Sequence, residues 1–160
     1  MTSKLFVNSL EPMQGNTINV AGSDTVLHAP GHVIQVVEGE YNTQTDITSQ
    51  SYTDSGLSVT ITPKFSSSKV YVITNLHTFV NGVGIIGVKI VRGSTSVLET
   101  QGASGYQDNS SDVVSMTKLD SPSTTSATTY KVQVNHNSAQ GLLRINQLGG
   151  SRITVMEIAQ

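Results

Sequence analysis

Cysteine is absent from this chain of 160 residues, and only 12% of its residues are charged. Without cysteine the chain can form neither disulfides nor thiolate metal sites, and such a composition suits a protein that must survive outside a cell. Its nine Lys and Arg residues, against eleven Asp and Glu, form no basic cluster that could neutralise a phosphate backbone. We therefore expect no nucleic-acid partner.

Long apolar runs are missing too. No segment approaches the roughly 18 consecutive apolar residues of a membrane-spanning helix. The first residues, "MTSKLFVNSLEPMQG", contain one lysine and no apolar run before Glu11 and Pro12, unlike a secretory signal peptide. We expect a soluble protein, made in a cytoplasm and not inserted into a membrane.

Hydroxyl side chains are abundant instead, with 21 serines and 19 threonines. Threonine suits strands and serine suits turns, whereas no window of the chain combines a 3.6-residue period with helix-forming residues. Short β-branched or alternating segments recur every 8–15 residues or so and predict about eight to ten strands. The predicted fold class is all-β, an antiparallel two-sheet sandwich or barrel.

Residues 1–30 differ from the rest of the chain. Their short apolar pieces are separated by Pro12, Gly15, Gly22 and Pro30, and none is long enough to build a core. We interpret 1–30 as an extended N-terminal arm and 31–160 as the β-sandwich domain. The arm residues expected to need a partner surface, and hence to act as anchors, are Leu5, Phe6, Val7, Ile18 and Val20.

Two segments define the predicted strands most clearly. In 57–61, Leu57, Val59 and Ile61 alternate with polar residues, and Pro63 ends the strand. The longest strand, 69–80, is apolar on both faces. Val70, Val72, Leu76 and Val80 alternate there with Tyr71, Ile73, His77 and Phe79. A strand with two apolar faces is buried on both sides or lies at a subunit interface. Because 69–80 and 83–91 both need more cover than one sandwich gives, we expect a homotrimer.

The spacing Gly82-x-Gly84-x-x-Gly87 matches the dinucleotide-binding fingerprint, which requires a helix that begins at these glycines. The residues that follow, 85–91, are mostly β-branched and favour a strand. Gly93 and Ser94 then predict a turn, and 95–100 a returning strand. We therefore predict a hairpin and no nucleotide site, with Gly87 at a bulge or a close backbone approach.

Two groups of residues have the types found at metal sites. His28 and His32 have the i, i+4 spacing of a helical zinc pair, but Pro30 and Gly31 between them disfavour a helix. The oxygen-rich run 108–112 (Asp108 to Asp112) lacks the glycine and glutamate of an EF-hand loop. We predict no metal and no cofactor. An axial metal on a threefold axis and a loop calcium both stay open.

No catalytic arrangement is visible. The chain has no G-x-S-x-G element, and Ser104 in "GASGY" is out of frame for one. No aspartate pair lies at strand ends as in glycosidases, and we expect a protein that is not an enzyme.

Tyr41, Tyr52 and Tyr106 lie in polar segments, where aromatic rings can stack on sugars or contact a receptor. The alternative is that each ring packs against its own sheet. Glu157 lies between Met156 and Ile158, and period-two alternation predicts that it faces solvent or an interface, opposite those two side chains.

The segments "SGLSVTITPKFSSSKVYVITNL", "TTYKVQV" and the final "SRITVMEIAQ" resemble the small jelly-roll module of tailed-phage structural proteins, as found in marine phages and cyanophages. That module is similar to the trimeric jelly roll of tumour necrosis factor and complement C1q. The opening "SKLFVNSLEPMQGNTINVAG" resembles the segment that precedes the module in phage fibres. The resemblance covers residues 4–160 and rests on strand and turn patterns.

The resemblance implies a homotrimer on a virion, in a fibre, knob or capsid decoration, with no catalytic residues. The arm would anchor it to the particle, and loops 41–56, 101–112 and 120–129 would project outward toward a host receptor. The arm is shorter than a fibre shaft, which favours a short appendage or a capsid-bound trimer. Two alternatives remain: a cement protein that clamps capsid subunits, and a cellular carbohydrate-binding jelly roll.

Overall fold

The computed structural model describes residues 29–82, 84–102, 109–137 and 141–160, and the predicted anchoring residues lie outside these ranges. Within them the chain forms ten strands and no helix. The strands are β1 (Val33–Tyr41), β2 (Thr45–Ile47), β3 (Thr53–Ile61), β4 (Lys69–Asn81), β5 (Ile86–Arg92), β6 (Thr95–Gln101), β7 (Ser110–Asp120), β8 (Thr128–His136), β9 (Leu142–Ile145) and β10 (Ser151–Ile158).

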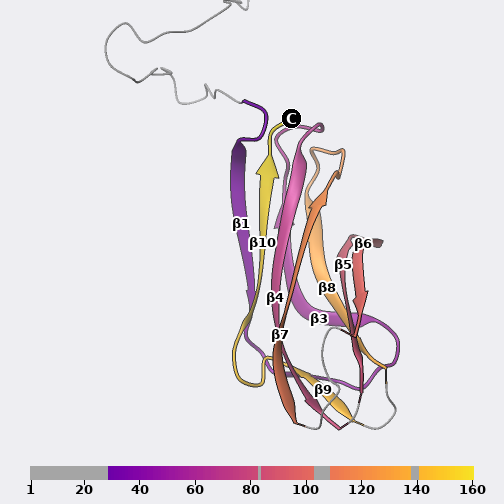
Figure 1. Ribbon diagram of the computed structural model, residues 1–160. Coiled ribbons are helices and arrows are strands. Elements are labelled where there is room, and N and C mark those ends of the chain that lie inside the picture. Colours follow the sequence, from indigo (N-terminus) through magenta and orange to yellow (C-terminus); the bar gives the residue numbers. More distant parts are fainter. Residues whose placement is uncertain (1–28, 83, 103–108, 138–140) are drawn as a thin grey trace, which may run out of the picture.

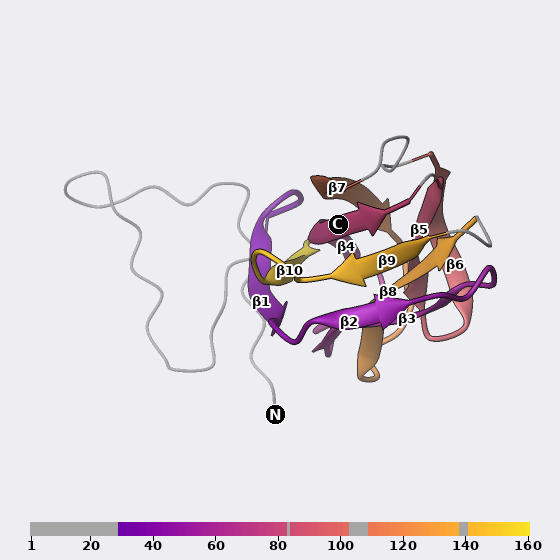
Figure 2. The ribbon, with the colours of Figure 1, turned by 90° about the horizontal axis from the view of Figure 1, so that it is seen from below.

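The strands form two antiparallel sheets packed face to face (Figures 1 and 2). The first sheet has the order β1-β10-β4, and β7 pairs with the other edge of β4 along nearly its whole length. Where the pairing of β4 with β10 ends, the last residues of β4 pair with β9 instead, and β9 pairs with β2. The second sheet has the order β3-β8-β5-β6. This confirms the predicted all-β fold, an antiparallel two-sheet jelly-roll sandwich.

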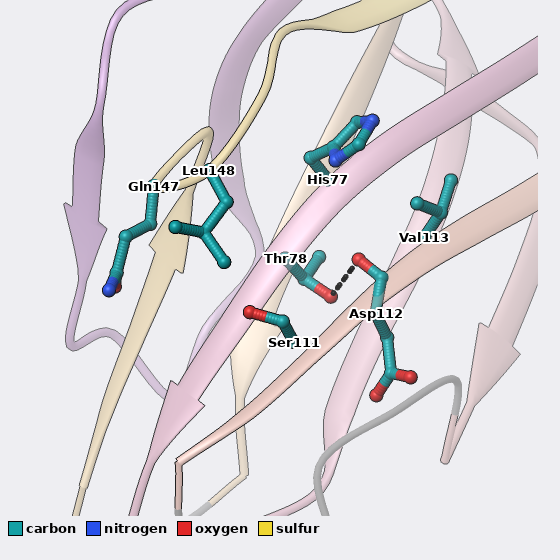
Figure 3. A pocket seen from close by; sticks show the side chains of 7 residues that line it. All are labelled: His77, Thr78, Ser111, Asp112, Val113, Gln147 and Leu148. Atoms are coloured by element: carbon teal, nitrogen blue, oxygen red, sulfur yellow. Dashed lines mark hydrogen bonds between the residues drawn. The ribbon is translucent and has the colours of Figure 1, made fainter.

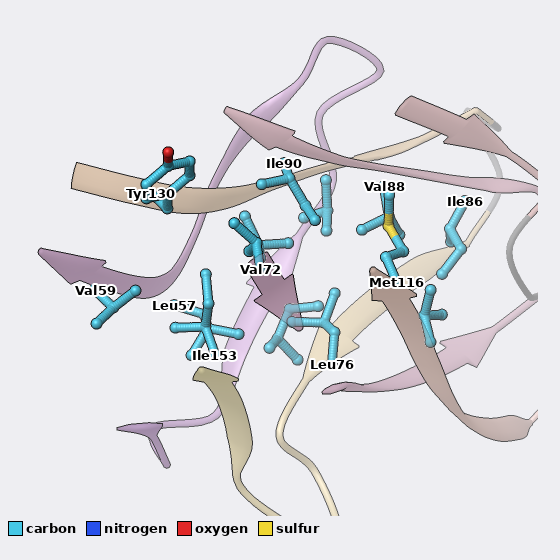
Figure 4. Close-up of a cluster of buried hydrophobic side chains, with 14 of the residues drawn as sticks. Leu57, Val59, Val72, Leu76, Ile86, Val88, Ile90, Met116, Tyr130 and Ile153 are labelled. Carbon is cyan, nitrogen blue, oxygen red and sulfur yellow. The ribbon is translucent and has the colours of Figure 1, made fainter. Parts of the chain in front are cut away.

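The core lies between the two sheets and follows from the alternation in the sequence (Figure 4). Leu57, Val59 and Ile61 point inward from β3, and Val72 and Leu76 point inward from β4. The opposite residues of β4 lie on the outer face of the first sheet and are partly exposed. The predicted strand with two apolar faces is therefore confirmed, with one face in the core and the other outside it.

The sandwich is closed on one side and open on the other. On the closed side β1 packs against β3, so tightly that a Cβ on Gly39 would collide with the backbone oxygen of Ser58. The Gln35 side chain also donates a hydrogen bond to the backbone oxygen of Thr62, at 2.8 Å. On the opposite side β6 and β7 diverge and leave a groove of about 410 Å³.

The glycine-rich stretch forms the predicted hairpin, since β5 pairs with β6 from Gly87 to Arg92. Gly87 lies where three polar side chains converge. A Cβ there would collide with Asn135, Tyr52 and Gln101, so the predicted close approach is confirmed. The residues that would open a nucleotide-binding helix form a strand instead.

Two details of the expected loops are wrong. The segment 41–56 contains the short strand β2 and the start of β3. The β7–β8 loop, 121–127, lies neither with the loop at 42–52 nor with the start of β7 at Ser110. The register of β7 on β4 brings Asp120 beside Val70, at the end where the described chain begins and the C-terminus lies (Figure 1). The described parts of the three loops expected to project toward a receptor therefore lie at opposite ends of the sandwich.

Candidate functional site

A row of apolar side chains crosses the outer face of the first sheet. Val36 on β1 faces Met156 on β10, Met156 faces Tyr71 on β4, and Tyr71 faces Leu119 on β7. Val36 is 55% exposed and Leu119 is 48% exposed. Val33, Ile158 and Ile73 continue the row on the same face, and we call these seven residues the apolar belt. The belt lies at the end of the sheet near the C-terminus.

Toward the other end the same face becomes polar. Glu40 on β1 pairs with Arg152 on β10 at 2.8 Å. In the same row, the Ser115 hydroxyl on β7 donates to the side-chain oxygen of Asn75 on β4 at 2.6 Å. These polar side chains pair with one another at the surface, so the apolar belt is bordered on this side by a polar, hydrated row.

The outer face of the second sheet has no such belt. Lys131 on β8 pairs with Asp54 on β3 at 2.7 Å, and Gln133 donates to the same carboxylate at 2.6 Å. Hydrogen bonds from Lys131 and Gln133 hold the pKa of Asp54 below its usual value, although partial burial acts in the opposite direction. The two sheets therefore present different surfaces: one is polar and hydrated, and the other is apolar at one end.

Tyr52 belongs to this polar surface and is not a free aromatic platform. Its hydroxyl donates to Glu99 at 3.1 Å and accepts from Gln101 at 2.6 Å, while Lys89 Nζ lies 4.2 Å from the ring centre. Burial of the hydroxyl, together with its hydrogen bond to Glu99 and the charge of that residue, raises the pKa of Tyr52 to about 12. The ring is thus occupied by its own sheet.

Tyr41 is also held by its own chain. Its ring packs on Gly56, where a Cβ would collide with it, and its hydroxyl shares a hydrogen bond of 2.8 Å with the Thr45 hydroxyl. Tyr106 lies outside the described residues. Of the three tyrosines expected at a receptor surface, Tyr41 and Tyr52 therefore have rings that contact other residues of their own domain.

A hollow of about 320 Å³ lies on the outer face of the first sheet beyond the polar row (Figure 3). Its lining residues are His77, Thr78, Ser111, Asp112, Val113, Gln147 and Leu148. Leu148, in the β9–β10 loop, is 76% exposed. The Asp112 carboxylate points away from the His77 ring, while Thr78 Oγ1 donates to the backbone oxygen of Asp112 at 3.3 Å. The side chains are therefore not arranged as a nucleophile, base and orienting acid.

Glu157 lies on the face opposite Met156 and Ile158 as predicted, but the prediction that this face meets solvent or an interface is wrong. The side chain is fully buried, whereas Met156 and Ile158 point outward. Its carboxylate accepts hydrogen bonds from Gln35 Nε2 at 2.6 Å and from the backbone amides of Lys64 at 2.7 Å and Phe65 at 3.2 Å. Burial raises the pKa of this carboxyl, but the hydrogen bonds outweigh burial and leave the pKa below its usual value. Glu157 thereby fixes the β3–β4 loop to the last strand.

A second buried polar group joins the two sheets. Tyr130 on β8 donates its hydroxyl to Asp120 on β7 at 2.7 Å, and Arg92 Nε on β5 lies 2.8 Å from the same carboxylate oxygen. Burial of the Tyr130 hydroxyl and its hydrogen bond to Asp120 raise its pKa. This contact crosses the sandwich near the open β6/β7 side.

The predicted metal-site residues are only partly described. His32 is exposed, and His28 lies outside the described ranges. Asp108 is also outside them, while Ser110, Ser111 and Asp112 belong to β7. In the parts of the chain that the structure describes, no three His, Asp or Glu side chains group as metal ligands would, and no helix has the length and apolar character needed to cross a membrane.

Comparison with known proteins gives only distant similarities of fold. No protein-family model matches the chain, and no curated protein matches it. The particle of infectious bursal disease virus contains a chain with a TM-score of 0.45 and 13% identity, over 91% of this chain and 41% of that one. Dimeric latent PorU from Porphyromonas gingivalis matches with a TM-score of 0.43 and 6% identity, over 88% of this chain and 14% of that one.

The virus-like particle of Macrobrachium rosenbergii extra small virus gives a TM-score of 0.26 and 16% identity, over 88% of this chain and 95% of that one. The chain thus spans about two fifths of the infectious bursal disease virus chain. Similarity at this level says nothing about what the chain binds or assembles with. The class that the structure itself defines is an antiparallel jelly-roll sandwich with one partly apolar outer face.

Proposed function

We propose that this chain is a non-enzymatic structural protein of a virion, and that it forms a trimer in which the apolar belt is covered by neighbouring copies. The observation that carries the proposal is the contrast between the two outer faces. Val36 and Leu119 are about half exposed on the first sheet, whereas the second sheet presents ion pairs and amides. An exposed apolar row with a polar border is typical of a protein interface.

The resemblance to phage jelly-roll modules supports both the trimer and the virion setting. Burying the exposed parts of the belt residues stabilises the assembly, at about 25 cal/mol per Å² of apolar surface removed from water. The polar face of the second sheet would then lie outside.

The N-terminal arm is the proposed attachment to the particle, through Leu5, Phe6, Val7, Ile18 and Val20. The described chain enters the domain beside its C-terminus, where Gly31 N donates to Ala159 O and Ala159 N donates to His32 O, each at 2.9 Å. The entry point is therefore fixed to β10. The loop at 42–52 and the start of β7 at Ser110 lie at the far end, which is the end that would contact a host receptor.

Light scattering at micromolar concentration tests the trimer first. The expected mass is near three times 17.0 kDa, and Met156→Lys should reduce it because a lysine ammonium would lie in the covered belt. Ser58→Lys, on the outer face of the second sheet, is the matched control and should leave the mass unchanged. A wild-type mass of one chain would overturn the trimer.

Deletion of residues 1–28 tests the anchor, with particle binding as the measurement. The shortened chain should keep its mass in solution and fail to bind particles. If it still decorates them, the arm is not the anchor. Immunogold labelling of particles then separates a tail appendage from a cement protein on the head.

A further inference from the structure

The open side of the sandwich is the second surface without an obvious cover. The groove between β6 and β7 is lined by Leu98 from β6 and by Val114 and Met116 from β7. Val114 and Met116 are core residues at the mouth of this groove. On the opposite side β1 and β3 close the sandwich, so the two sides are not equivalent.

β7 is an edge strand of unusual length for such a position. All eleven of its residues pair with β4, from Ser110 facing Val80 to Asp120 facing Val70. Within the described ranges no strand pairs with its other edge. An edge of this kind presents a row of backbone N–H and C=O groups that can pair with another strand.

We propose that this edge pairs with the β7 edge of a second copy, antiparallel and around a twofold axis at Ser115. In this register Asp112 of each copy faces Lys118 of the other, and Val114 faces Met116. The twofold symmetry produces each contact twice. The pairing would extend the first sheet across both copies and place apolar side chains over both grooves.

The charges favour this occupant and this register. Lys118 projects from an edge strand, where a lone cation disfavours pairing with an arbitrary strand. A strand with an acid at the facing position offsets that cost, and β7 itself carries one. Moving the axis to Val114 would place Asp112 opposite Met116. Moving it to Met116 would place Asp112 opposite Asp120.

The edge contact is independent of the apolar belt. Backbone hydrogen bonds of the edge lie in the plane of the sheet, whereas belt side chains stand perpendicular to it. One copy can therefore make both contacts. Above the micromolar concentrations at which the trimer is measured, trimers would then associate further into larger assemblies, and a chain that forms no trimer would still form a dimer.

Cysteine cross-linking tests the axis directly, because the natural chain has no cysteine. Directly facing residues of an antiparallel pair have Cα atoms about 4.5–5.5 Å apart, within the range of a disulfide. With oxidised glutathione as the oxidant, two Ser115→Cys thiols should form one disulfide and yield a covalent dimer. Ser58→Cys, at an exposed position of the other sheet, should cross-link at least about tenfold more slowly. Equal rates would overturn the proposal.

Charge reversal tests the register, in the Met156→Lys background, where the belt contact is removed. Light scattering should give two chains at high concentration. Lys118→Asp should raise the dissociation constant roughly tenfold, because it places like charges opposite each other twice. Adding Asp112→Lys should restore the dimer. The edge contact would be overturned if the Met156→Lys chain had the mass of one chain at every concentration, or if neither charge reversal changed the dissociation constant of its dimer. Failure of the proposed trimer is a separate result, because it is measured by the mass of the wild type.

Discussion

The Gln35 side chain donates to the Glu157 carboxylate at 2.6 Å and so links the first and last strands of the sandwich. The same carboxylate binds the amides of Lys64 and Phe65, where the chain passes from one sheet to the other. One buried acid therefore organises three segments that are far apart in sequence.

Glu157→Gln should lower the free energy of unfolding by about 2 kcal/mol, because an amide cannot accept all of the hydrogen bonds that the carboxylate accepts. Chemical denaturation at pH 7 measures the loss. Glu38→Gln, on the exposed face of β1, is the matched control and should stay within about 0.5 kcal/mol of the wild type. Equal effects of the two variants would contradict the role of Glu157.

The same contact predicts how stability depends on pH. The pKa of Glu157 is lowered in the folded chain from an ordinary value of 4.5, so below that value the unfolded state binds more protons. The contribution is complete above about pH 4.5 and is lost as the pH falls through the folded pKa. Denaturant titrations from pH 7 to pH 3 should show a smaller decline for Glu157→Gln than for the wild type.

Tyr130→Phe should destabilise the chain by about 1–3 kcal/mol, because the variant leaves buried Asp120 without the hydroxyl donor. Arg92 stays near the same carboxylate and limits the loss. Tyr71→Phe, on the outer face of β4, is the control and should have a much smaller effect on the unfolding midpoint in denaturant. If Tyr130→Phe left the free energy of unfolding unchanged, the hydrogen bond of the Tyr130 hydroxyl would not contribute to stability.

Gly87→Ala should cost about 1–3 kcal/mol, because the added methyl meets Asn135, Tyr52 and Gln101 at once. The loss should also appear in the titration of Tyr52, whose hydroxyl must move. Absorbance at alkaline pH follows that group, whose pKa of about 12 should fall toward the ordinary tyrosine value. Ser58→Ala on the same sheet should change neither quantity.

The belt predicts a dependence on protein concentration. If copies cover one another at Met156 and Leu119, the melting temperature should rise with concentration, since association stabilises the folded state. Leu119→Thr should weaken that dependence while leaving the melting temperature of the dilute chain nearly unchanged, because Leu119 is exposed in a single copy. A melting temperature independent of concentration in the wild type would contradict association through the belt.

The strand pattern could be predicted from the sequence because alternation repeats in 57–61 and 69–80, where most neighbours of the inward residues are polar or aromatic. β2 was missed because three residues are too few to show a period. Glu157 was misplaced for another reason. The two-residue period of a strand places Ile153, Val155 and Glu157 on one face of β10 and Met156 and Ile158 on the other. Both faces carry enough apolar side chains to be taken for the core face. The polar residues Arg152 and Thr154, on the same face as Met156, were the signal that could have decided it.

The belt and the open edge could not be predicted, since both depend on register between distant segments. Val36, Met156, Tyr71 and Leu119 lie in one row only because three separate pairings align them. The equal spacing of Asp112 and Lys118 from Ser115 is visible in the sequence. It indicates a contact between two copies only once β7 is known to be an edge strand.

The way the chain enters the domain has a mechanical consequence. β1 follows directly after residue 32 and pairs antiparallel with β10 from Val33 to Tyr41. A pull between a tethered N-terminus and the far loops would run along β1, nearly perpendicular to its ladder of hydrogen bonds. Such a force shears the whole ladder at once instead of peeling it one bond at a time. A domain held this way resists tension best in the direction in which a tether would apply it.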